Sequence, residues 1–367
     1  MLQESVVFTI VCHKNQKHQQ KSGGMGGGQP EIAVVVPLYN EESNIERCFT
    51  SLVNQTLDSS KYALFFVDGG STDKTKTLLH ELIEKNGNSL PHVLVLDNPK
   101  RSVPHARNIA LKHLPESVQF VVEHIGHGFV ENRHLEQRLA SWIECEKKYG
   151  PKLAGVGVKV ISDGDVVNRR SQWIESALQS WLGQSGGQFA RFSEVEITNT
   201  PAFVMHRREY LENIGGWDES FITSQDSELS MRLLRSGYIL ARSPSPTVMM
   251  KKRSTLLQWW KMGHRYGFWR TKVLKKYPSR VKFVELLPLL GLITTSFLFL
   301  LHQSSWVIPV LLYGLVMATD GVSQAVRTRN LSTLFGGPLC LFILHTSFSL
   351  GLIDGLFRKG RFSSDRR

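Results

Sequence analysis

The chain has 367 residues, of which 41% are hydrophobic and 21% are charged, a composition typical of a folded protein and not of a disordered one. Its formal net charge of +12 indicates an anionic partner, and a nucleic acid, an anionic lipid or an anionic substrate would each fit. The cysteines form no CxxC pair or metal-ligand spacing, which argues against a disulfide framework or a zinc site and suits a reducing compartment: Cys12, Cys48, Cys145 and Cys340.

Residues 1–30 contain a short apolar run, Val6–Val11, followed by a Gly-rich stretch. The run is shorter than the apolar core of a usual signal peptide, and no basic residue precedes it. We therefore expect residues 1–30 to be a disordered leader and the folded domain to begin near Glu31.

Short apolar runs alternate with helical patterns from there to residue 149. The expected strand and helix pairs are Ile32–Val36 with Glu42–Gln55, Leu64–Val67 with Asp73–Asn86, His92–Leu96 with Pro104–His113, and Val118–Val122 with Asn132–Tyr149. This alternation predicts an α/β domain with a mostly parallel, Rossmann-like sheet covered by helices, whose ligands bind at the carboxyl ends of the strands. Further strands at Leu153–Val160 and Ile197–Met205 and a helix at Asp226–Ser236 are expected to complete this domain, residues 31–250.

The composition changes after residue 250. Residues 251–282 are strongly basic and include a predicted amphipathic helix, Ser254–Lys276, with four aromatic side chains: Trp259, Trp260, Tyr266 and Trp269. Three apolar stretches then lie within residues 283–357: Leu286–Leu301, Trp306–Thr319 and Leu334–Phe357. A basic tail, residues 358–367, ends the chain. A basic flank before apolar stretches is typical of the cytoplasmic side of a membrane, and the aromatic side chains suit either the lipid headgroups or packing on the folded domain.

The apolar stretches predict two or three membrane helices. The first two are short against the roughly 20 residues that a spanning helix needs, and the third carries His345 and Asp354. A buried helical hairpin of a soluble protein is the alternative. Three full spans would put the basic tail outside, against the positive-inside tendency, so one stretch is expected to be re-entrant or interfacial. We expect a multi-pass protein of the inner (plasma) membrane with residues 31–250 in the cytoplasm.

Two polar motifs follow predicted strands. Pro37-Leu38-Tyr39-Asn40-Glu41 follows the first strand, and Asp68-Gly69-Gly70-Ser71-Thr72-Asp73 follows the second. The glycines permit a close backbone approach to a ligand, Ser71 or Thr72 can cap the next helix, and Asp68 is then free to accept hydrogen bonds from a base or ribose. Either motif alone is an ordinary turn with a helix cap, but two at this spacing favour a ligand site.

With these motifs the chain resembles the family 2 glycosyltransferases of the GT-A fold. The resemblance runs in order from Glu31 to Pro278 and includes Pro104-His105-Ala106-Arg107-Asn108, Gly215-Gly216-Trp217-Asp218-Glu219 and Gln225-Asp226-Ser227-Glu228-Leu229. It implies a nucleotide-sugar donor, most simply a UDP-sugar. It also implies substrate-binding roles for one set of side chains: Pro37, Tyr39, Glu41, Asp68, Arg107, Trp217, Asp218 and Gln225.

The same resemblance implies that Asp226 is the catalytic base of an inverting transfer, which takes a proton from the acceptor hydroxyl. A helix-terminal carboxylate stabilised by the helix dipole is the plain alternative for Asp226, as a solvated helix position is for Arg107.

The usual metal motif of the fold is degenerate in this chain. The stretch after the fourth strand reads Val122-Glu123-His124-Ile125-Gly126-His127, which puts Ile125 where the resemblance expects a metal-binding Asp. Three alternatives follow: Glu123 and His127 hold a divalent cation, Mn²⁺ or Mg²⁺; Arg and Lys alone handle the charge of the diphosphate; or activity is lost.

The Gly126-His127 pair and the C-terminal tail resemble the succinoglycan-type exopolysaccharide transferases, which implies a membrane-anchored enzyme with a lipid-linked saccharide or polysaccharide acceptor. A catalytically degenerate paralogue that binds nucleotide-sugar or a partner transferase is the alternative. A nucleic-acid partner is not expected, because the basic and aromatic residues lie beside the apolar stretches and no nucleic-acid-binding signature is present.

Overall fold

The computed structural model describes residues 29–87, 90–163, 168–183, 192–250 and 253–360. The expected leader, residues 1–30, lies almost entirely outside the described residues. The chain forms two compact units. We call residues 29–161, 192–220 and 229–250 the sheet unit, and residues 162–183, 221–228 and 253–360 the helical unit. Two segments inside the range expected for one domain, 31–250, therefore pack with the C-terminal helices.

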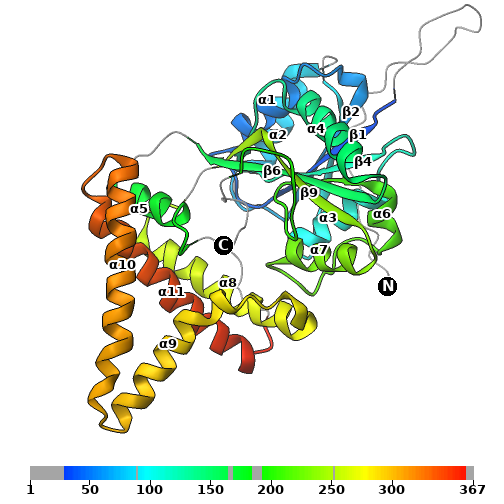
Figure 1. Ribbon diagram of the computed structural model, residues 1–367. Coiled ribbons are helices and arrows are strands. Elements are labelled where there is room, and N and C mark those ends of the chain that lie inside the picture. Colours follow the sequence, from blue (N-terminus) through cyan, green and yellow to red (C-terminus); the bar gives the residue numbers. More distant parts are fainter. Residues whose placement is uncertain (1–28, 88–89, 164–167, 184–191, 251–252, 361–367) are drawn as a thin grey trace, which may run out of the picture. The chain divides into compact units, whose positions relative to one another are not determined.

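The described strands of the sheet unit form one mixed sheet in the order β3-β2-β1-β4-β8-β6-β9-β5, with β7 paired to β9. Figure 1 labels β1, β2, β4, β6 and β9 of this sheet. Strands β1 to β4 are parallel, and β8, β5 and β7 pair antiparallel with their neighbours. The strand bounds are β1 Ile32–Leu38, β2 Tyr62–Asp68, β3 His92–Asp97, β4 Phe120–Glu123, β5 Gly128–Phe129, β6 Leu153–Ser162, β7 Glu196–Ile197, β8 Met205–Arg207 and β9 Ile239–Met250. The predicted α/β class is confirmed. The sheet is mixed, because strands that pair antiparallel extend the parallel strands β1 to β4.

Alternating side chains of the strands build two cores, one on each face of the sheet. In β1, Val34 and Val36 point into the core formed with α1, α2 and α4, whereas Ala33 and Val35 point into the core formed with α3, α6 and α7. Because β1 is buried on both faces, its sequence is a continuous apolar run and not an alternating one. The helix bounds are α1 Ile45–Val53, α2 Thr75–Asn86, α3 Val103–Lys112, α4 His134–Tyr149, α6 Arg208–Asn213 and α7 Gln225–Arg235.

The prediction of a strand at Ile197–Met205 is wrong in its extent. Only β7 and β8 are strands there, and residues 198–204 between them are irregular. Pro201 lies in this segment, and a proline has no N–H to donate to a neighbouring strand. The sequence analysis predicts no strand at β9, which contains Pro244 and Pro246, a residue type that is uncommon inside strands.

Five helices make up most of the helical unit. Their bounds are α5 Arg169–Leu178, α8 Leu256–Lys276, α9 Phe283–Leu300, α10 Val307–Thr328 and α11 Thr333–Phe357. A Cβ on Gly263 of α8 would lie 2.0 Å from Ser347 Oγ of α11, and one on Gly267 would lie 2.0 Å from the Phe348 carbonyl oxygen. Small residues thus let α8 and α11 approach closely, as in membrane helix pairs.

Two of the four aromatic side chains of α8 are buried and two are exposed. Trp259 and Trp269 are buried, and Trp259 Nε1 donates to the Cys340 carbonyl over 2.8 Å, whereas Trp260 and Tyr266 are more than one-third exposed. The candidate membrane spans are Phe283–Leu300, Ser304–Thr328 and Thr333–Phe357, each long and apolar enough to cross a bilayer. The three apolar stretches of the sequence are thus three helices with membrane-spanning character.

Candidate donor site and base-bearing segment

The carboxyl ends of three parallel strands meet at one edge of the sheet. Leu38, the last residue of β1, pairs in register with Asp68, the last residue of β2, and Asp68 pairs with Asp97 at the end of β3. Pro37 pairs with Val67 and is half-buried. Polar groups that follow these strands therefore lie side by side at the edge where α/β sheets bind ligands.

Hydrogen bonds tie the turn after β1 to the turn after β2. The Asn40 N–H donates to Ser71 Oγ over 3.0 Å, and the Thr72 N–H donates to Asn40 Oδ1 over 2.8 Å. The Glu41 N–H donates to Thr75 Oγ1 over 2.7 Å. Asn40 has a left-handed backbone with φ 54°, a conformation that Asn tolerates better than most residues. The two predicted motifs therefore form one connected structure.

Asp68 is buried, and its carboxylate accepts hydrogen bonds from the turn that follows it. Oδ2 accepts hydrogen bonds from the Gly70 and Ser71 N–H groups, both over 3.0 Å, and Oδ1 accepts one from the Ser71 hydroxyl over 2.5 Å. The sequence predicts a carboxylate free to bind a base or ribose, but Asp68 is 2% exposed and holds the turn. Its contact with a nucleoside stays a prediction.

Arg101, which was not among the residues predicted from the sequence, lies at the same edge after β3. Its guanidinium stands over the Tyr39 ring, 5.9 Å from the centroid, and both side chains are exposed. A Cβ on Gly70 would lie 3.4 Å from one of the Arg101 amino nitrogens. An exposed cation and an exposed aromatic ring thus meet above the predicted glycine turn. The position of Arg101, four residues after the end of β3, is the signal that could have identified it.

Glu41 and His127 form a close pair. Glu41 Oε1 lies 2.7 Å from His127 Nδ1, and both side chains are about nine-tenths buried. The Asn44 amide donates to the other oxygen, Oε2, over 2.9 Å. A Cβ on Gly126 would lie 2.7 Å from Glu41 Cγ and 2.8 Å from Leu38 Cδ2, so only glycine fits beside Glu41 without a shift. Glu41, predicted to bind the nucleoside, and His127, predicted to bind a metal, are therefore paired with each other.

Arg107 and Glu123 form a buried ion pair. Arg107 Nη1 lies 3.0 Å from Glu123 Oε1, and the same oxygen accepts a hydrogen bond from Trp217 Nε1 over 3.1 Å and lies 3.4 Å from His206 Nε2. Burial alone would raise the pKa of Glu123, but Arg107, His206 and Trp217 outweigh it and lower that pKa to about 2. Arg107 and Trp217, both predicted to bind substrate, are only 5% and 2% exposed, so direct contact with a nucleotide would require them to become exposed.

The predicted metal ligands do not fit a divalent cation as they stand. Glu123 forms an ion pair with the buried Arg107, and His127 pairs with Glu41. In the ranges that the structure describes, no three His, Cys, Asp or Glu side chains gather where they could hold a metal ion. Ile125 supplies no donor.

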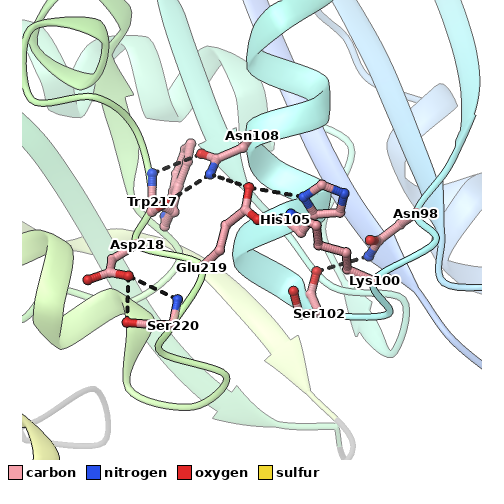
Figure 2. Close-up of polar contacts among 9 residues, drawn as sticks. All are labelled: Asn98, Lys100, Ser102, His105, Asn108, Trp217, Asp218, Glu219 and Ser220. Carbon is pink, nitrogen blue, oxygen red and sulfur yellow. Dashed lines mark hydrogen bonds and ion pairs between the residues drawn. The ribbon is translucent and has the colours of Figure 1, made fainter. Parts of the chain in front are cut away.

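Figure 2 shows a further polar cluster in which helix α3 faces the loop before α7. Glu219 Oε1 lies 3.0 Å from His105 Nδ1, and Glu219 Oε2 accepts from Lys100 Nζ over 2.7 Å. The Asn108 amide donates to the Trp217 carbonyl over 2.8 Å and accepts from the Trp217 N–H over 2.9 Å. Burial raises the pKa of Glu219, but the hydrogen bonds from His105, Lys100 and Asn108 outweigh burial and lower this pKa to about 2.

Asp218, another predicted substrate-binding residue, lies in the same loop. Its Oδ1 accepts a hydrogen bond from the Ser220 N–H over 2.9 Å.

Gln225 and Asp226, the remaining predicted residues, lie in the first turn of α7 and in the helical unit. Asp226 is half-buried, and its Oδ1 accepts from the Ser227 N–H over 2.8 Å. Glu228 beside it is fully buried and accepts from Lys276 Nζ over 2.7 Å and from the Tyr277 hydroxyl over 2.8 Å. Hydrogen bonds from Lys276 and Tyr277 therefore hold residues 221–228, the segment with the predicted base, against the end of α8.

Comparison with protein families identifies two overlapping matches. The chain matches the model of glycosyl transferase family 2 over residues 33–215 and that of glycosyl transferase family group 2 over residues 130–353. The second match covers more than half of the chain and includes the apolar helices.

Curated relatives and a solved structure extend this result. The chain is 26% identical to a dolichyl N-acetyl-alpha-D-glucosaminyl phosphate 3-beta-D-2,3-diacetamido-2,3-dideoxy-beta-D-glucuronosyltransferase of Methanococcus voltae, over 89% of this chain and 97% of the relative. It is 27% identical to the succinoglycan biosynthesis protein ExoA of Rhizobium meliloti, over 87% of this chain and 92% of the relative. Its fold is similar to that of a Pyrobaculum calidifontis mannosyltransferase determined with GDP-mannose and Mn²⁺, with a TM-score of 0.57, 16% identity, and coverage of 92% and 91% of the two chains.

Proposed function

The chain belongs to the family 2 glycosyltransferases, and on this basis we propose that it transfers a sugar from a UDP-sugar to a lipid-linked saccharide or polysaccharide acceptor with inversion at the anomeric carbon. It is a glycosyltransferase, and nucleotide-sugar use follows the family. We propose three further features of the reaction: a uridine nucleotide as the donor, inversion at the anomeric carbon, and a lipid-linked saccharide or polysaccharide as the acceptor.

One observation supports the donor site more than any other: the interlocked turns at the ends of β1 and β2, above which Tyr39 and Arg101 are exposed. An aromatic ring can stack on a nucleobase, and a guanidinium can make paired hydrogen bonds to phosphate oxygens. Backbone at Gly69 and Gly70 comes close to this surface. We therefore expect the nucleotide to lie over the carboxyl edge of the parallel strands, with Asp68 holding the turn beneath it.

Asp226 is the group that we expect to act as the base. The acceptor hydroxyl oxygen forms a bond to the anomeric carbon while the bond from that carbon to the diphosphate oxygen breaks. The proton of the hydroxyl passes to the Asp226 carboxylate, and the bonding electron pair leaves with the nucleoside diphosphate. A side chain that is half-buried and not fully enclosed suits this task, because the acceptor must reach it.

The acceptor class is inferred from the relatives and from the C-terminal helices. The printed name of the Methanococcus relative specifies a dolichyl-linked sugar phosphate, and ExoA is named for succinoglycan biosynthesis. An acceptor held in a bilayer suits a chain with three helices that could cross one. We propose a multi-pass protein of the inner (plasma) membrane, with the sheet unit in the cytoplasm, because basic residues precede the first apolar stretch.

The test is radiolabelled transfer by the purified full-length chain in lipid nanodiscs that contain a membrane lipid extract. A panel of UDP-, GDP- and dTDP-sugars identifies the donor, and chromatography of the product gives the anomeric configuration. Parallel reactions with EDTA, and with added Mn²⁺ or Mg²⁺, show whether a divalent cation takes part. Transfer only from GDP- or dTDP-sugars would reject the UDP proposal, and retention of configuration would reject inversion.

Binding without turnover is the outcome that would favour the degenerate paralogue. If calorimetry shows UDP binding but no donor of the panel is consumed, the enzyme proposal fails, and the buried Arg107–Glu123 pair would mark a site that binds and does not catalyse. Salt-sensitive DNA binding without nucleotide-sugar binding would reject both readings.

A further inference from the structure

Helices α8 and α11 run side by side, although only α11 has the composition of a membrane span. Near the start of the contact, Trp259 Nε1 of α8 donates to the Cys340 carbonyl of α11 over 2.8 Å. Near the end of both helices, Lys272 Nζ donates to the Gly355 carbonyl over 2.9 Å. The two helices are therefore parallel and in contact over most of the length of α11. We call them the α8–α11 pair.

The part of α8 that contacts α11 carries cationic side chains along its whole length. Between Trp259 and the end of the contact, the cationic residues are Lys261, Arg265, Arg270 and Lys272. Charged side chains are costly in the hydrocarbon of a bilayer, whereas at the membrane surface they meet water and anionic headgroups. If α11 crossed the bilayer, its contacts with α8 would draw these cations into the acyl chains. The α8–α11 pair therefore suits the membrane surface.

Both ends of α11 are also tied to segments that the chain joins to the sheet unit. At its start, Trp173 Nε1 of α5 donates to Ser332 Oγ over 3.1 Å, and α5 begins seven residues after β6 ends. Seven residues of extended chain reach at most about 25 Å, which is less than the roughly 30 Å of a hydrocarbon core. At its end, α11 contacts the part of α8 that is held by Glu228, the residue directly before the sheet unit resumes. Both ends of α11 thus belong to the side of the membrane that holds the sheet unit.

The exposed side chains of α11 form one apolar stripe. Its most exposed large apolar side chains recur at the spacing of a single helix face. Five of them define the stripe: Phe335, Leu339, Phe342, Leu350 and Phe357. Other faces of the helix are buried within the helical unit, largely through small residues. A helix with one apolar stripe is typical of the membrane interface, where the stripe enters the acyl chains and the opposite face remains at the headgroups.

Helix α9 has a different surface. None of its residues is buried, and large apolar side chains are exposed all around it. Its 18 residues extend about 27 Å, close to the thickness of the hydrocarbon core. The turn to α10 exposes His302, Gln303 and Ser304. Because an irregular turn cannot satisfy its backbone polar groups in lipid, this turn must reach headgroups or water on the opposite surface.

Two crossings also match the distribution of basic residues. The α9–α10 turn, residues 301–306, contains no Lys or Arg, whereas Arg327 and Arg329 lie at the end of α10, and the basic tail follows α11. If α9 and α10 cross and α11 does not, all these basic residues lie on the side of the sheet unit. A third crossing would place the tail on the opposite side, against the positive-inside tendency.

We propose that the α8–α11 pair lies at the membrane surface on the side of the sheet unit, with the apolar stripe of α11 against the acyl chains, while α9 and α10 cross as a hairpin. Both ends of this hairpin meet the pair. Arg270 Nε of α8 lies 3.2 Å from Glu285 Oε2 in the first turn of α9, and Gly337 of α11 packs against Gln324 near the end of α10. The proposal rests on the proposed membrane location of the chain and not on the transfer reaction.

Cysteine labelling in membrane vesicles tests the number of crossings. The full-length chain carries a Cys12→Ser change, since the other cysteines are buried, and receives one new cysteine. Ile143→Cys on α4 reports the side of the sheet unit, because Ile143 is 66% exposed. Ser304→Cys reports the α9–α10 turn, and Lys359→Cys reports the chain after α11; both native residues are exposed.

We expect a membrane-impermeant thiol reagent to label the cysteines at 143 and 359 in vesicles of one orientation, and the cysteine at 304 several-fold faster in vesicles of the opposite orientation. Labelling of 359 together with 304 would show that α11 crosses and would overturn the proposal. Labelling of all three in the same vesicles would overturn the crossing hairpin. If 143 and 359 label together in right-side-out vesicles, the cytoplasmic placement of the sheet unit fails, but the proposal stands.

A depth measurement in lipid nanodiscs compares α11 with α9. Phe342→Cys near the middle of α11 and Ile293→Cys near the middle of α9 are matched, because both native side chains are 53% exposed. Each cysteine carries an environment-sensitive probe. Lipid brominated close to the headgroup should quench the probe at 342 several-fold more than lipid brominated near the end of the acyl chain, and this order should be reversed at 293. Equal depth of the two probes within the acyl chains would overturn the surface position of α11. Quenching of neither probe would overturn the membrane location, and the proposal with it, whether or not the chain transfers sugar.

Discussion

The sheet unit and the helical unit place their polar groups in different ways. In the sheet unit, carboxylates such as Asp68 and Glu123 are enclosed and satisfied by neighbours of the same unit. In the helical unit, the segment with Asp226 is held by Glu228 through Lys276 and Tyr277, while Asp226 itself stays half-buried. We propose that the first arrangement maintains a surface for the nucleotide and that the second positions the proton acceptor.

The proposed roles assign donor binding and proton acceptance to different units. The residues predicted to bind the nucleoside belong to the sheet unit, whereas Gln225 and Asp226 belong to the unit that carries the apolar helices. Substitutions in the sheet unit should therefore change nucleotide affinity or folding, and those around Asp226 should change the rate of transfer. Four substitutions test this division, beginning with the largest expected effect.

Asp226→Asn should lower the rate of transfer by about 10²–10⁴-fold, because it removes the proton acceptor and nearly preserves the size of the side chain. The dissociation constant for UDP, measured by calorimetry, should not change. Glu84→Gln, which removes an exposed carboxylate from α2, is the control and should leave both quantities as in the wild type. A normal rate for Asp226→Asn would leave it a helix-terminal carboxylate with no part in the reaction.

Glu123→Gln should destabilise the protein by about 3–5 kcal/mol, because it leaves the buried Arg107 guanidinium without its counter-charge. Denaturant unfolding of the full-length chain in detergent measures this loss.

The effect of Glu123 should also depend on pH. Its folded-state pKa of about 2 lies below the ordinary value of 4.5, so its stabilisation is complete above about pH 4.5 and is lost as the pH falls toward 2. The difference in stability between the wild type and Glu123→Gln should shrink over that interval. A difference that is the same at every pH would show that the Arg107–Glu123 pair is not the cause.

Glu228→Ala should lower the rate of transfer by up to about 10²-fold while UDP affinity is unchanged, because the segment with Asp226 loses its attachment to Lys276 and Tyr277 and a small misplacement of a catalytic group is costly. Tyr277→Phe removes one of the two hydrogen bonds and should have a smaller effect in the same direction. Loss of UDP affinity in either variant would contradict the division between the units.

Asp68→Ala should weaken UDP binding by about 1–3 kcal/mol, since the turn beneath the nucleotide loses three hydrogen bonds. The matched control is Asp97→Ala: this carboxylate also ends a parallel strand, but it is exposed and paired with Lys76. Equal losses for the two variants, or an equal affinity of the wild type for every nucleoside diphosphate, would reject base recognition at this turn.

Local patterns in the sequence were sufficient for much of the fold. The βα alternation up to Tyr149 predicted the parallel strands β1 to β4 and their helices, because strand and helix periodicity are properties of neighbouring residues. The apolar stretches after residue 282 predicted α9, α10 and α11 for the same reason. The ordered motifs from Pro37 to Gln225 identified the family.

Contacts between distant residues decided the rest. The strand β9 pairs despite its prolines, because the sheet offers partners for a segment with little strand character of its own. Arg107, a predicted substrate-binding residue, and Glu123, a predicted metal ligand, are 16 positions apart, and the fold brings them together as a buried ion pair. Glu228 and Tyr277 are 49 positions apart, and Ser180 and Asp320 are 140 positions apart, yet each pair is joined by a hydrogen bond. Only the folded chain brings such residues together, so no local pattern of the sequence predicts these contacts.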